Sequence, residues 1–495
     1  QLFVVDLLEA GDADEVALQV VGPAVVGAHE AGCVAFFGAA DRIAISSAVN
    51  TLTAGTPVSL TLTAEDSFGN RVPTYAGTKQ LIFGGSPDPN QTGFAATVSR
   101  DNPPGGNIDF GSNTQIEFSD GEAVTSSGHN GVMRLYKAGV FSINVKESPN
   151  SLASGTYGSK TYTVTSSLSQ VLALDLASPQ VNRTAFAGTN TISLKDIYGN
   201  PVSTRPVTIT TSLPGSIIIA GSGNDNVLNS ELATGTANLA AGGLAMRYEG
   251  AANATATFTA TTANPLGGFL TATDSVVMNH ATPSLIRIQG ATTTDPIANT
   301  LTVTAGQAIS LTTRLYDQDG NAATTYATAT GLVFTLSPNP STAAQVSDND
   351  GGGLITINGT NATTLNYAAG VSTVASNGSN GVLRLYKTGT YTLTATSSSP
   401  AMTTQTGHVL VITVVPAPAN SVQVSLQDGQ TNNVTFTGTN TLTVFDQYTN
   451  TVSSFGTNGE RITLTVTSPV TGVLALPGAA TGQPVLTVLA TGGGV

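Results

Sequence analysis

The sequence predicts an all-β protein built from repeated domains, and three observations lead to this prediction. Only 9% of the residues are charged while 40% are apolar, which argues against long helices and coiled coils because these are rich in Glu and Lys. Apolar and polar residues alternate through many short stretches, as they do in strands with one buried face. A fifteen-residue stretch also occurs twice, at 131–145 and 381–395, so the second copy begins 250 residues after the first (381 minus 131).

The repeated stretch contains a predicted strand. After its Lys-x-Gly turn, Phe141, Ile143 and Val145 alternate with polar residues, and residues 391–395 repeat the pattern. The Gly-x-aromatic-x-apolar spacing resembles strand F of an immunoglobulin-type sandwich, in which the aromatic residue stands two positions before a core cysteine. Ile143 and Leu393 take the cysteine's place, so the resemblance implies an Ig-like sandwich without its disulfide.

Four turns of the form Asp-x-x-(Gly/Thr)-Asn give the chain its period. They begin at Asp66, Asp196, Asp317 and Asp446, which places them 130, 121 and 129 residues apart. Asp bonds to the backbone of its own turn and Gly accepts positive φ, so each motif predicts a tight connection between strands. Regular spacing of this kind indicates an array of similar domains.

Matching motifs around these turns predicts an alternating A-B-A-B order with a period of about 250 residues. The expected segments are the terminal strands of a B-type domain (1–41), domain A1 (42–167), domain B1 (168–283), domain A2 (284–416) and an incomplete domain B2 (417–495). The Pro/Gly/Asn-rich insertions at 84–115 and 340–370 occupy matching places in the two A domains. We expect lateral contacts there, because loops carry such variation.

The amino-acid sequences around two of these turns resemble those of a known family. Residues 54–78, which begin Ala-Gly-Thr-Pro-Val-Ser-Leu, resemble the Ig-like repeats of very large bacterial surface proteins. Residues 194–202, Leu-Lys-Asp-Ile-Tyr-Gly-Asn-Pro-Val, are similar to the invasin/intimin-type Ig-like module. The resemblance extends over nearly all of residues 42–495, and it implies tandem Ig-like sandwiches of the kind found in adhesins, surface-layer subunits and extracellular fibres.

The two ends of the sequence suggest a relation between them. With the offset of 250, residues 493–495 match residues 243–245, so the fourth domain is expected to lack its last strands. Residues 1–41 stand where a B-type domain ends. Two interpretations stay open: the chain is a window on a longer array, or subunits join head to tail and residues 1–41 complete the neighbour's fourth domain by strand addition.

Charge and cysteine content narrow the class of protein. The formal net charge is −13 with only 17 Lys and Arg, which argues against nucleic acid and against a polybasic membrane patch because both need clustered cations. The single cysteine, Cys33, excludes an intrachain disulfide. The most apolar region, residues 15–40, is interrupted by polar residues, so no membrane-spanning segment is expected. An extracellular location on the cell surface fits best.

The sequence contains few residue patterns that indicate catalysis or metal binding. No nucleophile elbow, zinc motif or nucleotide fingerprint appears, so we expect no catalytic residues and no enzyme. Two Gly-containing loops carry carboxylates two residues apart, a spacing that suits calcium or, equally, simple Asx turns. The candidate calcium ligands are Asp317, Asp319, Asn321, Asp348 and Asp350.

The function expected from these features is structural. The favoured interpretation is a non-enzymatic, self-assembling subunit of a prokaryotic surface layer, sheath or fibre, with other copies of itself and cell-wall or matrix glycans as partners. The alternative is the stalk of a large adhesin that presents a binding tip. A third interpretation, non-catalytic modules of a secreted polysaccharide-degrading enzyme, requires a catalytic domain elsewhere.

Overall fold

The structure is a computed structural model, and it describes most of the chain from residue 37 onward. The described ranges are 37–85, 88–149, 159–202, 205–290, 299–340, 344–349, 353–375, 377–431, 434–455, 461–466 and 485–490. The described residues fall into two compact units, which divide between Thr165 and Ser166. Within the described ranges every regular element is a strand except two 3-10 turns, so the all-β prediction is confirmed.

Unit 1 contains one β-sandwich, called the first domain. Its strands pair in three sheets, in the orders β1-β4-β9, β3-β10-β6-β7 and β2-β12-β11-β5-β8. The described strands are β1 (Arg42–Ser46), β2 (Thr51–Thr53), β3 (Pro57–Ser59), β4 (Thr61–Glu65), β5 (Gly77–Gly84), β6 (Thr97–Ser99), β7 (Asn107–Asp109), β8 (Asn113–Phe118), β9 (Glu122–Val124), β10 (Val132–Arg134), β11 (Gly139–Glu147) and β12 (Lys160–Thr165).

The alternation seen in the sequence builds the core of this domain. In β11, Ile143 and Val145 are buried while the residues between them are exposed. β12 alternates in the same way, with Tyr162 and Val164 buried, and it pairs with β11 in antiparallel register. Tyr162 is fully buried, and its hydroxyl bonds to Ser47 at 2.9 Å. Period-two alternation therefore predicted β11 correctly.

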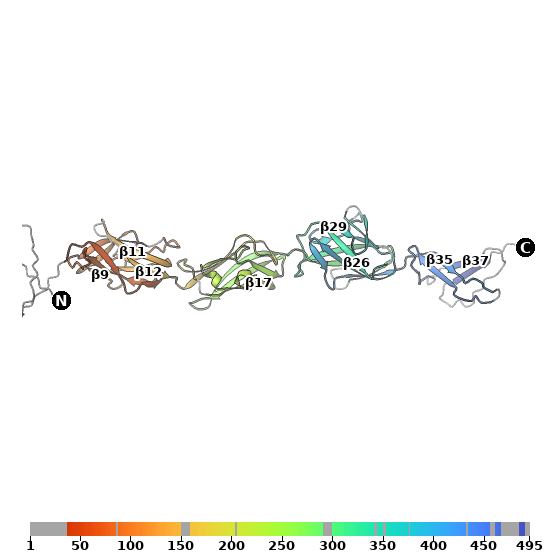
Figure 1. Cartoon of the computed structure of the whole chain (residues 1–495), viewed down its shortest axis with the longest axis horizontal. Helices are drawn as coiled ribbons and strands as arrows, with labels where there is room; N and C mark the ends of the chain where they lie inside the picture. The colour runs from red at the N-terminus through yellow and green to blue at the C-terminus, as the bar shows by residue number, and fades with distance from the viewer. Residues whose placement is uncertain are drawn as a thin grey trace, which may run out of the picture. The chain divides into compact units, whose positions relative to one another are not determined.

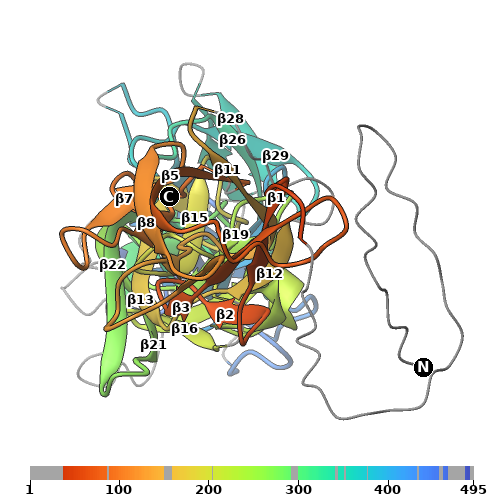
Figure 2. The same cartoon turned by 90° about the vertical axis from the view of Figure 1, so that its left-hand side faces the viewer.

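The second domain opens unit 2. Its elements are β13 (Ser169–Leu176), β14 (Gln180–Val181), β15 (Asn190–Asp196), β16 (Val207–Thr211), β17 (Gly215–Ile219), η1 (Ala220–Ser222), β18 (Val227–Leu228), η2 (Ser230–Leu232), β19 (Thr236–Asn238), β20 (Met246–Gly250), β21 (Ala254–Ala263) and β22 (Phe269–Asn279). The long hairpin of β21 and β22, visible in Figure 2, closes a core around Phe186, Phe258 and Tyr248.

The third domain has its own core, and one extended sheet runs through it. In Figure 1, β26 lies beside β29, with which it pairs. The strands are β23 (Leu285–Gly290), β24 (Asn299–Thr304), β25 (Ala308–Tyr316), β26 (Thr330–Ser337), β27 (Ala344–Ser347), β28 (Leu354–Ile357), β29 (Ala362–Leu365), β30 (Val371–Ser372), β31 (Val382–Arg384), β32 (Gly389–Ser398), β33 (Ala401–Thr404) and β34 (Leu410–Val415).

The fourth domain is described as two strand pairs. β35 (Ala419–Ser425) pairs with β36 (Thr441–Asp446), and β37 (Arg461–Val466) pairs with β38 (Val485–Ala490). Several of its described apolar residues are exposed, with Val424 at 43% and Phe436 at 40%, although Val444 and Ile462 are buried. The fourth domain therefore differs from the second, whose residues at the matching positions are buried.

The structure differs from one sequence expectation, and another falls outside the described residues. The insertions at 84–115 and 340–370 were expected to be loops, but they carry the short strands β6, β7 and β27–β29. Their Pro, Gly and Asn residues mark the turns between these strands. The strand segments predicted within residues 1–36 lie outside the described part of the chain, and the domain limits predicted at 168, 284 and 417 fall between β12 and β13, β22 and β23, and β34 and β35.

Candidate functional site

The four Asp-x-x-(Gly/Thr)-Asn turns share one geometry. In each, one carboxylate oxygen accepts the backbone N–H groups two and four residues later, as Asp446 does from Tyr448 and Asn450 at 2.8 Å. The fourth position has positive φ, between 67° and 87°. Glycine adopts this conformation without strain, which explains Gly at three turns; Thr449 takes it at the fourth.

The second carboxylate oxygen binds the segment that enters the domain. It accepts the backbone N–H of a residue before the domain's first strand, at 2.8 to 3.0 Å. The four pairs are Gly38 with Asp66, Ser167 with Asp196, Ala281 with Asp317, and Ala417 with Asp446. All four carboxylates are buried, so each turn fixes the entering segment to the domain body.

The hydrogen bonds to these carboxylates favour their charged form. The Gly38 amide, followed by bonds from Asn70 and Phe68 that outweigh burial, lowers the pKa of Asp66 to about 2. Burial acts against ionisation of Asp446, but the bonds from Asn450, Ala417 and Tyr448 together still lower its pKa. A carboxylate that accepts several N–H groups is stabilised as the anion, so the turns at Asp66 and Asp446 keep their bonds at neutral pH.

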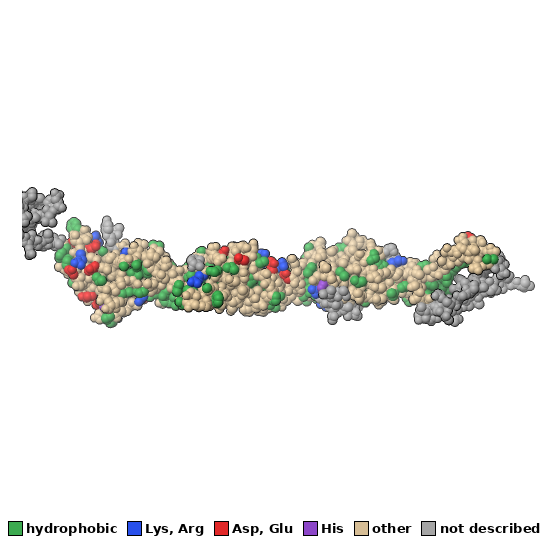
Figure 3. All heavy atoms as spheres, turned by 90° about the horizontal axis from the view of Figure 1, so that it is seen from below, with side chains coloured by type: hydrophobic (Ala, Val, Ile, Leu, Met, Phe, Trp, Pro, Cys, Tyr) green, Lys and Arg blue, Asp and Glu red, His purple; other side chains and the backbone are tan. Residues whose placement is uncertain are grey.

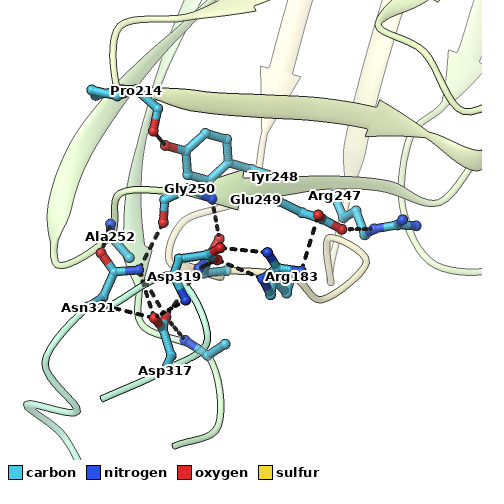
Figure 4. Close-up of polar contacts among 12 residues, drawn as sticks. Arg183, Pro214, Arg247, Tyr248, Glu249, Gly250, Ala252, Asp317, Asp319 and Asn321 are labelled. Atoms are coloured by element: carbon cyan, nitrogen blue, oxygen red, sulfur yellow. Dashed lines mark hydrogen bonds and ion pairs between the residues drawn. The ribbon is translucent and has the colours of Figure 1, made fainter. Parts of the chain in front are cut away.

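At two turns of unit 2, those ending at Asn321 and Asn450, the asparagine also contacts the preceding domain. Figure 4 shows Asn321 between the second and third domains: its amide nitrogen donates to the carbonyl of Gly250 at 2.8 Å, and its amide oxygen accepts the N–H of Ala252 at 2.8 Å. The same amide nitrogen lies 2.9 Å from Asp317. We call the Asp and Asn of one turn the latch, because together they hold the entering segment and the preceding domain.

An ionic cluster lies beside this latch (Figure 4). The Arg183 guanidinium donates to both oxygens of Asp319, at 2.7 and 2.5 Å, and approaches Glu249 at 3.2 Å. The bond from Arg183 outweighs burial and lowers the pKa of Asp319. Arg183 has φ of +61°, a left-handed conformation that costs of order 1 kcal/mol and that folded proteins retain mainly at functional positions.

Further contacts cross the same junction. His280, which is buried, accepts the Thr325 N–H through Nε2 at 3.2 Å, and its Nδ1 lies 2.7 Å from the carbonyl of Ala281. Asn253 donates to the carbonyl of Ala322 at 2.7 Å. The second and third domains are thus joined by a continuous set of hydrogen bonds.

The junction between the third and fourth domains repeats the latch with different surroundings. Asn450 donates to the carbonyl of Tyr386 at 2.7 Å and accepts the N–H of Thr388 at 3.0 Å. The neighbouring contact is aromatic, since the rings of Tyr448 and Tyr386 lie 5.0 Å apart. Tyr448 also covers Gly306, where a Cβ would stand 2.0 Å from the Tyr448 hydroxyl, so this position accepts only glycine.

The structure brings three of the five candidate calcium ligands together. Asp317, Asp319 and Asn321 meet at the junction, where their oxygens bond to protein donors, whereas Asp348 lies in the loop after β27 and Asp350 is outside the described residues. Among the described residues no group of three or more His, Cys, Asp or Glu is placed to hold a metal. Calcium binding at these positions remains a prediction.

The described part of the chain offers little room for a small substrate. A hollow in unit 1, lined by Phe94, Tyr136 and Phe141 among others, encloses about 10 Å³, space for roughly one water molecule. None of the described segments forms a helix that could cross a membrane. Figure 3 shows a face made mostly of uncharged polar side chains and backbone, with few charged groups, in keeping with the 9% of charged residues.

Sequence reasoning identified the turn residues but not their partners in the preceding domain. Arg183, Asn253 and His280 carry no repeated motif that marks them. The one signal for the junction was the recurrence of the Asn at the end of each turn. That asparagine is required by the turn itself, so its second role was visible only in three dimensions.

Comparison with known proteins gives matches only among solved structures. No protein-family model matches the chain, and no curated protein does. The chain is similar to the Escherichia coli adhesin FdeC (14% identity, TM-score 0.37, covering 77% of this chain and 99% of that one). It is also similar to InvD of Yersinia pseudotuberculosis (17%, 0.32, 74% and 97%) and to surface layer protein SbsC, domains 1–6 (16%, 0.20, 83% and 44%). At these identities and TM-scores the matches carry no argument about what this chain binds or builds.

Proposed function

We propose that the chain is a non-enzymatic, extracellular structural protein, a self-assembling subunit of a prokaryotic surface layer, sheath or fibre. The observation that carries the proposal is the latch, which joins successive domains of unit 2 through buried carboxylates and paired asparagine bonds. Such bonds resist bending between domains, and a row of sandwiches that resists bending can serve as a wall element or spacer. A surface with few charges and a chain with one cysteine suit this role.

Self-assembly has a specific candidate surface in the fourth domain. Its exposed apolar residues, among them Val424, Leu426 and Phe436, occupy positions whose counterparts in the second domain pack beneath β20–β22. We propose that strands supplied by another copy cover this face, in the manner of β-strand addition. Head-to-tail addition that does not close into a ring produces a filament.

Electron microscopy of the purified chain, with a deletion variant beside it, tests this proposal. We expect ordered filaments or sheets from the full chain, and single particles from a variant that lacks residues 1–41, the segment expected to supply the strands. Sedimentation velocity on the same two samples should show large species only for the full chain. Assembly that survives the deletion would contradict strand addition, and single particles from both would contradict self-assembly.

The alternative function, the stalk of a large adhesin, is favoured by one observation. The latches at Asn321 and Asn450 join consecutive domains of the same chain, so a stalk needs no contact between chains. Single extended particles in the electron micrographs would support it. Binding to cell-wall or matrix glycans stays a prediction, which co-sedimentation with insoluble cell-wall polymer would test.

A further inference from the structure

The two junctions in unit 2 share the latch but differ in one adjacent position. The latch bonds match almost atom for atom: Asn321 and Asn450 each donate to one carbonyl and accept one N–H of the preceding domain, at 2.7 to 3.0 Å. The residue in the middle of the turn is Asp319 in one case and Tyr448 in the other. The latch therefore attaches the domains at both junctions, and the middle residue of the turn is what distinguishes one junction from the other.

At the first junction the middle residue meets a cationic surface. Asp319 takes a two-pronged bond from Arg183 and a third bond from Asn182 at 2.7 Å. The side chains of Arg183 and Asp319 are only 30% and 16% exposed. Two-pronged guanidinium–carboxylate pairing is directional and stronger than a neutral hydrogen bond, so this surface recognises a carboxylate at that position.

At the second junction the middle residue meets an aromatic and glycine surface. Tyr448 packs against Tyr386 with ring planes tilted by 53°, and it packs against the apolar core of the third domain. Gly306 leaves space for its hydroxyl end. An aspartate here would place a carboxylate against an aromatic face with no cation beside it, and burial of an unpaired charge is strongly unfavourable.

We propose that the middle residue of each Asp-x-x-(Gly/Thr)-Asn turn selects which type of domain can precede it. An aspartate selects a domain that presents Arg183, whereas a tyrosine selects a domain that presents Tyr386 and Gly306. Recognition of this kind depends on the mismatch at wrong pairs as much as on the contact at right ones. The proposal does not depend on whether the array forms a layer, a fibre or a stalk.

The rule extends to the first domain. Its turn carries Phe68 at the middle position, and this side chain is 87% exposed in unit 1. Phe68 belongs with Tyr448 rather than with Asp319. The surface formed by Phe68 and Asn70 therefore fits a domain that presents an aromatic ring, as Tyr386 does between β31 and β32.

Hydrogen exchange of the full-length chain tests the proposal at each junction separately. The Ala252 amide reports on the first junction and the Thr388 amide on the second, because each donates to a latch asparagine. Arg183→Glu and Asp319→Arg should each speed exchange at Ala252 at least about fivefold, since a repulsive pair opens the junction. The double variant should return exchange to the wild-type rate, while Thr388 stays unchanged throughout.

Substitutions of Tyr448 test the second junction in the same experiment. Tyr448→Asp should speed exchange at Thr388 by a similar factor and leave Ala252 unchanged, whereas Tyr448→Phe should keep the wild-type rate. Amides in the β21–β22 hairpin act as an internal check that the second domain stays folded. Single variants that leave the junction amides unaffected, or a double charge swap that fails to restore Ala252, would overturn the proposal.

Discussion

The second and fourth domains carry the same local motifs, yet several apolar residues that are buried in the second are exposed at the matching described positions of the fourth. In the second domain Gln180 bonds to the backbone of Ala177 and Ala187, and in the fourth Gln430 makes the same bonds to Gln427 and Thr437, 250 residues later (430 minus 180). Phe186, however, is fully buried while Phe436 is 40% exposed. Local hydrogen bonding thus forms from nearby sequence, whereas burial depends on strands far along the chain.

The strands that make this difference are β20, β21 and β22. They place Tyr248, Phe258 and Met278 over the apolar residues of the second domain. The comparison separates two contributions to a sandwich: turns and short-range bonds that set the geometry, and distant strands that exclude water.

The largest expected effect comes from removing the buried ring. Phe186→Ala should destabilise the second domain by about 3–5 kcal/mol, because it leaves a cavity beside Phe258, whose ring lies edge-on at 5.6 Å. Phe436→Ala should cost less than about 1 kcal/mol, since the ring is already partly in water. Segment-resolved hydrogen exchange in urea measures both, and equal losses would contradict the comparison.

A smaller effect is expected at Gln180, whose side chain bonds to the backbone of Ala177 and Ala187. Gln180 is buried, so Gln180→Ala removes the side-chain partner of the Ala177 carbonyl and of the Ala187 N–H, at about 1–3 kcal/mol. Gln430→Ala is the matched control, and water can replace its bonds at a cost below about 0.5 kcal/mol. The same exchange measurement would contradict this prediction if the fourth domain lost as much stability as the second.

Acid should weaken the turns in a defined pH range. Asp66 has a folded-state pKa of about 2 against an ordinary 3.8, and the pKa of Asp446 is also lowered. A carboxyl with a lowered folded-state pKa adds stability above its unfolded pKa and loses it as pH falls toward the folded value. The melting temperature should therefore drop between about pH 4 and pH 2.

Asparagine variants provide the control for the acid prediction. Asp66→Asn and Asp446→Asn remove the titration but keep an oxygen acceptor, so each variant should start less stable and show a shallower fall in melting temperature below pH 4 than the wild type. The hydrogen bonds of the Asp446 turn form although nearby apolar residues of the fourth domain are exposed. The Asp446 carboxylate should therefore still contribute to the stability of the fourth domain. A wild-type curve that is flat from pH 4 to pH 2 would contradict the lowered pKa values.

The smallest expected effect concerns calcium. The predicted ligands Asp317 and Asp319 share their oxygens with Arg183 and Asn182, so a cation must compete with these donors. Calcium at about 1 mM, the weak end of extracellular sites, should raise the melting temperature of Arg183→Ala more than that of the wild type. The matching turn in the fourth domain, with Tyr448 in place of Asp319, should not respond. A larger rise for the wild type, abolished by Asp319→Asn, would show that Arg183 does not compete.

The sequence predicted the parts of the structure that rest on short-range chemistry. The alternation at 141–145 identified β11. The turns at Asp66 and its three counterparts were also correct in kind, because Asx bonding and positive φ involve residues only two to four positions apart.

The junction contacts were beyond sequence reasoning for a physical reason. Asn321 reaches Gly250, 71 residues earlier, and Arg183 reaches Asp319, 136 residues later. Neither separation follows any helical or strand period, and both depend on how two finished domains meet. Asp317 and Asp319 were recognised as a pair of carboxylates, but the residues that bond to them come from another domain.

The latch affects how a gene that encodes such domains can be lengthened by duplication. Because every domain brings its own entering segment and its own turn, copying a stretch of gene adds a module without redesigning its neighbours. The differing middle residues, Asp319 and Tyr448, restrict which copies succeed, since a single inserted domain sets one of them against the wrong surface. Copying two neighbouring domains at once sets each copied middle residue against the type of surface it already faces, and the fifteen-residue stretch of this sequence recurs after 250 residues.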